Sequence, residues 1–94
     1  MKVKVRAFAT LSNLLGGGFL EVELPEGSTV GDLLAELVRR FGKPFREAVM
    51  EEDGRLSKYV KVFVNGRDID FLSGLDTALR DGDEVALIPP AGGG

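Results

Sequence analysis

A single apolar stripe between residues 29 and 42 constrains the fold of this chain more than any other feature. Its apolar side chains recur at the three- and four-residue spacing of one helix face: Val30, Leu33, Leu34, Leu37, Val38 and Phe41. Thr29 and Asp32 form the capping pattern that begins a helix, and Gly42 is a typical end. A chain of 94 residues has room for one small core. We therefore expect one long helix against which the other elements pack.

Alternating apolar and polar residues predict strands before and after this helix. The alternation is present at residues 2–8, 19–24, 59–64 and 84–88. Asn65-Gly66 predicts a tight hairpin that leads into a short additional strand. Pro44 suits the first turn of a second, shorter helix. The loop over residues 70–80 is expected to be anchored by Leu72, Leu75 and Leu79.

The order of these elements predicts the fold class. Two strands, a capped helix and further strands indicate an α+β domain with a mixed sheet and one long helix packed on one face. This is the β-grasp arrangement of ubiquitin. The first and last strands are then central neighbours, and their apolar side chains face the helix: Val3, Val5, Val85 and Leu87.

The composition argues against several classes of protein. The chain contains no cysteine and no histidine, so it lacks a thiol nucleophile and the commonest general base and metal ligand. We expect no metal site, no bound cofactor and no catalysis by the chain alone. A net charge of −3 argues against a nucleic-acid partner. No long apolar run or leader peptide is visible, so a cytoplasmic location without membrane contact is expected.

The final segment combines a turn, a strand and an unusual end. Pro89 and Pro90 stop the last strand, because proline cannot donate to a β-ladder. Three glycines follow after one alanine: Gly92, Gly93 and Gly94. The run GDEVALIPPAGGG resembles the C-terminus of the MoaD/ThiS family of ubiquitin-like sulfur carriers. Within that family, the chain is most similar to the small, sulfur-carrying subunit of molybdopterin synthase.

The resemblance implies a function for the chain end. The α-carboxylate of Gly94 would be adenylated by a MoeB-like, ubiquitin-activating-enzyme-like adenylyltransferase, which uses ATP. Conversion to a thiocarboxylate would let it donate sulfur in molybdenum cofactor biosynthesis, inside a MoaE-like large subunit of molybdopterin synthase. The chain then divides into a β-grasp domain over residues 1–90 and a flexible, reactive tail over residues 91–94. Gly92, Gly93, Pro89 and Pro90 shape that tail.

Two alternatives stay open. The same terminal chemistry serves ubiquitin-like carriers for tRNA thiolation and modifiers joined to protein lysines, and the sequence does not separate these from the first reading. A plain β-grasp binding module with an inert glycine tail would not be adenylated by any activating enzyme.

Alternation also predicts a partner-binding patch. Phe8, Phe63 and Ile88 are expected on the sheet face away from the helix, and the same face carries the basic residues Lys2, Lys4, Arg6 and Lys61. Apolar groups ringed by positive charge are typical of a protein–protein surface. Coverage of this face by the second helix or by residues 70–80 is the alternative.

Overall fold

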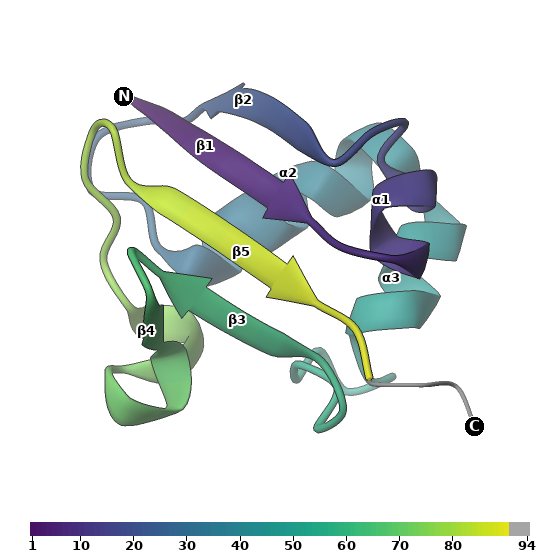
Figure 1. Cartoon of the computed structure of the whole chain (residues 1–94). Coiled ribbons are helices and arrows are strands. Elements are labelled where there is room, and N and C mark those ends of the chain that lie inside the picture. Colours follow the sequence, from purple (N-terminus) through teal and green to yellow (C-terminus); the bar gives the residue numbers. More distant parts are fainter. Residues whose placement is uncertain (91–94) are drawn as a thin grey trace.

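The computed structural model of the chain describes residues 1–90, which form a five-stranded sheet with helices on one face. The strands are β1 (Lys2–Ala7), β2 (Phe19–Glu23), β3 (Lys61–Val64), β4 (Arg67–Asp68) and β5 (Glu84–Ile88). The helices are α1 (Thr10–Leu14), α2 (Val30–Phe41) and α3 (Lys43–Val49), followed later by the 3₁₀ turns η1 (Ile69–Phe71) and η2 (Gly74–Asp76). Figure 1 shows α2 and α3 behind the sheet. Within residues 1–90, no helix crosses the face toward the viewer (Figure 1).

The sheet has the order β2-β1-β5-β3-β4. β1 and β5 are parallel neighbours at its centre, and the remaining pairs are antiparallel (Figure 1). Because side chains alternate across a strand, these two central strands bury their apolar residues against α2: Val3, Val5, Val85 and Leu87 are fully buried. The mixed sheet and the β-grasp fold predicted from the sequence are confirmed.

α2 begins and ends where its sequence predicts. The Thr29 N–H donates to Asp32 Oδ2 at 2.9 Å, and the Asp32 N–H donates to Thr29 Oγ1 at 3.2 Å, which completes a capping box. At the other end, Gly42 has a positive φ of 79°, and its N–H donates to the Val38 carbonyl at 2.7 Å. The two caps and the apolar stripe therefore identify the same helix.

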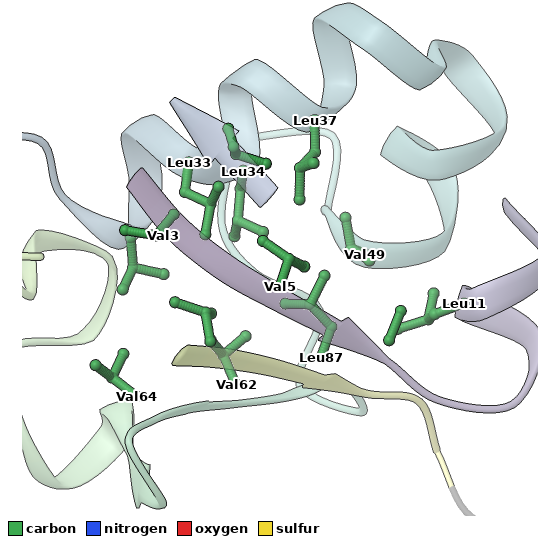
Figure 2. Packing of buried hydrophobic residues seen from close by; sticks show 14 of the residues in the cluster. Val3, Val5, Leu11, Leu33, Leu34, Leu37, Val49, Val62, Val64 and Leu87 are labelled. Atoms are coloured by element: carbon green, nitrogen blue, oxygen red, sulfur yellow. The ribbon is translucent and has the colours of Figure 1, made fainter. Parts of the chain in front are cut away.

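The core lies between α2 and the sheet. Figure 2 shows Leu33, Leu34 and Leu37 of α2 above the valines of β1 and the side chains of Val62 and Leu87. α1 and α3 close one end of this core with Leu11, Phe45 and Val49, which are all buried. These short helices therefore contribute side chains to the core.

The loop after β4 differs in part from its expected packing. Leu79 is buried and Leu75 packs against the core, but Leu72 is 39% exposed. Ile69, the first residue of η1, is buried in the core instead, and η1 turns the chain before Leu72 can reach it. The expectation for Leu72 was wrong.

No helix among residues 1–90 is both long enough and apolar enough to span a lipid bilayer.

Candidate functional site

The base of the tail lies at the middle of the sheet. β5 ends at Ile88 between β1 and β3 (Figure 1). The Phe8 N–H donates to the Leu87 carbonyl at 3.2 Å, so the parallel ladder continues one residue beyond the end of β1. This pairing brings Phe8 level with Ile88, and Ile88 is in register with Lys61 on the other side. The chain therefore leaves the sheet from a central strand flanked on both sides.

The sheet face opposite α2 carries an apolar patch around this exit. Phe8 is 47% exposed, whereas Phe63 and Ile88 are half-buried. None of these three side chains belongs to the core, as alternation predicts. Within residues 1–90, neither α3 nor the turns after β4 cover Phe8, but the half-burial of Phe63 and Ile88 makes them less accessible than expected.

A further aromatic residue lies on this face and was missed in the sequence. Strand register aligns Phe63 with Ala86, Ala86 with Arg6, and Arg6 with Phe19 on β2. Phe19 is 50% exposed, and the Arg6 guanidinium lies 5.6 Å from its ring centroid. The alternation in residues 19–24 carried this signal, because Phe19 shares parity with the outward Glu21 and Glu23. The outer-face patch is defined here as Phe8, Phe19, Phe63, Ala86 and Ile88.

The charge around the outer-face patch is mixed, which corrects the expected positive ring. The Arg6 Nε donates to Glu84 Oε1 at 3.0 Å. The Lys61 Nζ lies 3.2 Å from Asp70 and 3.5 Å from Asp68, and these carboxylates, Asp70 first, raise the pKa of Lys61. Lys2 and Lys4 form no ion pair with a side chain of residues 1–90. Two of the four expected cations are therefore paired with acids: Arg6 with Glu84 near the other end of the chain, and Lys61 with two aspartates at the end of the β3–β4 hairpin and just after it.

An unusual backbone conformation lies beside the outer-face patch. Ala9 follows Phe8 with φ 51° and ψ −127°, a backbone conformation that residues other than glycine rarely adopt. The Ala9 carbonyl accepts two hydrogen bonds from Ser12, at 3.1 Å from its N–H and at 2.7 Å from its hydroxyl. These bonds hold the reversal between β1 and α1 that leaves Phe8 at the surface.

The predicted tail residues are only partly described. Pro89 is half-buried and Pro90 is exposed directly after β5. Gly92, Gly93 and Gly94 lie outside the described residues. Within residues 1–90, no group of three or more acidic side chains gathers in a way that could hold a metal ion.

Comparisons with known proteins cover the whole chain. Residues 5–94 match the ThiS family. A putative sulfur carrier protein of Archaeoglobus fulgidus is 39% identical, and small archaeal modifier protein 3 of Haloferax volcanii is 35% identical; both matches cover 100% of each chain. The molybdopterin synthase sulfur carrier subunit of Chlamydomonas reinhardtii is 34% identical, also with 100% of each chain covered.

Solved structures agree with this assignment. The crystal structure of SAMP1 from Haloferax volcanii superposes with a TM-score of 0.84 at 34% identity and covers 100% of both chains. A chain in the crystal structure of the Amycolatopsis orientalis BexX/CysO complex gives a TM-score of 0.76 at 30% identity, with 98% and 99% coverage. The fold, the element order and full-length relatives together show that this chain belongs to the ThiS/MoaD family of ubiquitin-like sulfur carriers and modifiers.

Proposed function

We propose that the reactive group of this chain is the α-carboxylate of Gly94, which carries sulfur as a thiocarboxylate. The observation that supports this most is the exit of a central strand through the outer-face patch, where Pro89 and Pro90 follow Ile88. An extended chain from Pro89 to Gly94 spans about 20 Å, which is enough to enter a partner's buried site. Gly93 and Gly94 lack a Cβ and would fit a narrow channel.

The chemistry requires an activating partner. The Gly94 carboxylate would attack the α-phosphate of ATP in a MoeB-like adenylyltransferase, displacing pyrophosphate and leaving an acyl-adenylate. Hydrosulfide would then attack the acyl carbon and displace AMP, which leaves the thiocarboxylate. This chain offers neither cysteine nor histidine for either step. Its own contribution is to present the terminus, so we propose a non-catalytic subunit.

The outer-face patch is the surface proposed to dock these partners. Phe19 presents an exposed ring opposite Arg6 on β2, and Phe8 presents one two residues after Arg6. Phe63, Ala86 and Ile88 extend the apolar area toward β3. Aromatic side chains with a nearby arginine are typical of interface centres. A partner seated there would lie directly beside the base of the tail, which limits the distance that the terminus must reach.

For the sulfur acceptor, we propose the molybdopterin precursor bound to a MoaE-like large subunit. The full-length relative from Chlamydomonas reinhardtii, named as a molybdopterin synthase sulfur carrier subunit, supports this choice. The second candidate is a modifier joined to lysines or a carrier for tRNA thiolation. The full-length relative named small archaeal modifier protein 3 supports the modifier.

One experiment tests the carrier chemistry itself. The protein should be purified from its own host without acid or reductant. Its intact mass should then include a species heavier by the difference between sulfur and oxygen. Fragmentation should place that difference on Gly94. The inert binding module would be supported instead by two results together: only the unmodified mass is found, and the host's activating enzyme does not adenylate the chain with ATP.

A second experiment separates the acceptors. The thiocarboxylate form should be mixed with the host's large molybdopterin synthase subunit and the pterin precursor, and dithiolene formation should be measured. The same form should also be incubated with host lysate and ATP, after which branched peptides on substrate lysines should be sought. Dithiolene formation without branched peptides supports the molybdopterin proposal, and the reverse result supports the modifier.

A further inference from the structure

β2 leaves one edge of the sheet open. In the order β2-β1-β5-β3-β4, β2 pairs only with β1, so its other side has no neighbouring strand among residues 1–90 (Figure 1). The opposite edge strand, β4, has only two residues, whereas β2 has five. β2 also contains no proline and keeps an unbroken register, so it lacks two common protections of an edge strand.

The hydrogen-bond pattern identifies the backbone groups on this open edge. Met1 and Leu24 exchange two hydrogen bonds, at 2.8 and 2.9 Å, and the Ala7 N–H donates to the Gly18 carbonyl at 3.0 Å. Bonded and non-bonded pairs alternate in an antiparallel ladder. Between these two anchors, Leu20 and Val22 therefore bond to β1. The N–H and C=O groups of Phe19, Glu21 and Glu23 point outward.

The side chains of the same three residues define what can pair there. Glu21 and Glu23 are exposed on the outer face, and neither takes part in an ion pair within residues 1–90. Basic residues at alternate positions of an added strand would form stabilising cross-strand pairs with these glutamates. A cation or an apolar group would pair in the same way with Phe19. β1 already has this pattern on the other side, where Lys2 faces Glu23, Lys4 faces Glu21 and Arg6 faces Phe19.

Two further features indicate which kind of strand can pair with β2. A second copy that paired β2 with β2 around Glu21 would bring that carboxylate opposite its own copy, and like charges directly opposite are unfavourable. On the α2 side, Leu20 is half-buried at the edge. An open groove of about 530 Å³ begins at Leu24, and its lining combines Pro25 and Ala35 with the charged residues Glu26, Asp32, Glu36 and Arg39. The edge therefore suits an added strand with an apolar residue beside Leu20 and basic residues facing outward.

We infer that β2 docks an extended segment of a partner protein, which adds as a sixth strand and carries lysine or arginine at alternate positions. Main-chain hydrogen bonds to Phe19, Glu21 and Glu23 would supply affinity, and the glutamates would select the basic sequence. This docking mode does not depend on the chemistry of Gly94. It also uses an edge that the outer-face patch does not occupy, except at the shared residue Phe19.

The test uses the full chain and a blocked peptide, acetyl-LKVKVRAF-amide, which copies residues 1–8 with leucine in place of Met1. When the peptide pairs antiparallel with β2, the peptide's leucine would lie opposite Leu24, at the groove. Amide hydrogen exchange should be followed by NMR as peptide is added up to millimolar concentration. The amides of Phe19, Glu21 and Glu23 should exchange rapidly in the free protein and become protected by the peptide. Those of Leu20 and Val22 should be protected throughout.

Matched peptides test the backbone pairing. N-methylation of the peptide's second lysine should abolish protection, because that N–H would face Glu21. N-methylation of the following valine should have little effect, because its N–H would point away from β2. Equal loss with both methylated peptides would overturn the proposal, as would peptide-induced exposure of Leu20 and Val22, which would mean that β1 is displaced.

Matched protein variants test the charge selection. Glu21→Gln combined with Glu23→Gln should weaken peptide binding by about threefold or more, because two favourable cross-strand pairs are lost. Glutamine places no like charge opposite Lys2 and Lys4 of β1. Glu51→Gln combined with Glu52→Gln changes the net charge equally in an exposed loop outside the edge and should leave binding within about 1.5-fold. Unchanged binding in the first variant, no protection at millimolar peptide, or a free protein already paired through this edge would each contradict the inference.

Discussion

Phe8 and Ile88 lie level with each other across the two central strands, because the Phe8 N–H donates to the Leu87 carbonyl at 3.2 Å. The residue that ends β5 is therefore fixed to the residue that follows β1. A partner that covers Phe8 also approaches the point where the tail begins. This relationship ties the proposed docking surface to the proposed reactive end.

Phe8→Asp should leave the domain folded and weaken partner binding. Phe8 is 47% exposed and lies outside the core, so the thermal midpoint should change little. Binding to the activating enzyme should fall by at least about tenfold if Phe8 lies at the interface centre. Calorimetric titration of both proteins measures this.

Phe71→Asp is the matched control for that change. Phe71 is 88% exposed on η1, outside the outer-face patch, so it presents a phenylalanine of even greater exposure. Equal losses of binding in the two variants would mean that general hydrophobicity, and not the patch, governs docking. Unfolding by Phe8→Asp would contradict its outward placement.

Leu37→Ala should destabilise the domain by about 2–5 kcal/mol, because the side chain is fully buried between α2 and the sheet. Chemical denaturation gives the free energy of unfolding. Ala35→Ser on the exposed side of the same helix should change it by less than about 0.5 kcal/mol. A Leu37→Ala loss of that small size would contradict the helix orientation shown in Figure 2.

Much of the fold follows from local patterns in the sequence. Thr29, Asp32 and Gly42 mark the ends of α2, and alternation alone places Val3 and Val85 against it. These signals act over a few residues and agree with one another, so they survive in the folded chain. The hairpin at Asn65-Gly66 is of the same kind, because both residues adopt positive φ.

Other features depend on contacts that no local pattern contains. Glu84 reaches Arg6 only after β1 and β5 have paired, and Asp70 reaches Lys61 only after the β3–β4 hairpin has formed. The mixed charge around the patch could therefore not be predicted from alternation within single strands. Leu72 is apolar but follows a 3₁₀ turn that points it outward. Phe19 could have been predicted, because the parity rule applied to Phe8 also applies to it.

The backbone of Ala9 could not have been predicted either, since alanine gives no signal for a positive φ. Ala9→Gly should stabilise the domain by about 1 kcal/mol, because relief of the strain exceeds the entropy cost of glycine. Thermal and chemical unfolding measure the change. Ala78→Gly is the control, because Ala78 lacks a positive φ and the substitution should destabilise by about 0.5–1 kcal/mol. Destabilisation by both changes would contradict the strained conformation.

The stability of the domain should respond to the ionisation of Glu36 at low pH. Hydrogen bonds from Arg39 and Arg40 lower the pKa of Glu36 from 4.5 to about 2. A carboxylate whose pKa is lower in the folded state stabilises the fold above the unfolded value, and this contribution disappears as pH falls through the folded value. Glu36→Gln should therefore lower the thermal midpoint near neutral pH, with the difference shrinking between about pH 4.5 and pH 2.

An NMR titration measures the same effect at the residue itself. The carboxyl carbon of Glu36 should titrate near pH 2 in the unmodified protein. It should titrate at a higher pH in a variant with both Arg39→Gln and Arg40→Gln, because the three hydrogen bonds that these arginines donate to Glu36 are then removed. An identical midpoint in the two proteins would show that the arginines do not hold this carboxylate.

The position of the terminal carboxylate is the centre of the proposed function. One residue appended after Gly94 would move the carboxylate by about 3.3 Å, whereas a misplacement of about 1 Å can cost a hundredfold in rate. The most direct measurement is therefore thiocarboxylate formation and sulfur transfer, followed by intact mass, with the host's activating enzyme, ATP and a sulfur source. We compare the unmodified chain, a chain with one added alanine and a chain lacking Gly94. We predict that both altered chains lose transfer completely while their thermal midpoints stay unchanged, because the last core residue among residues 1–90 is Leu87. Full transfer by the extended chain, with no protease restoring the Gly94 terminus, would contradict the account.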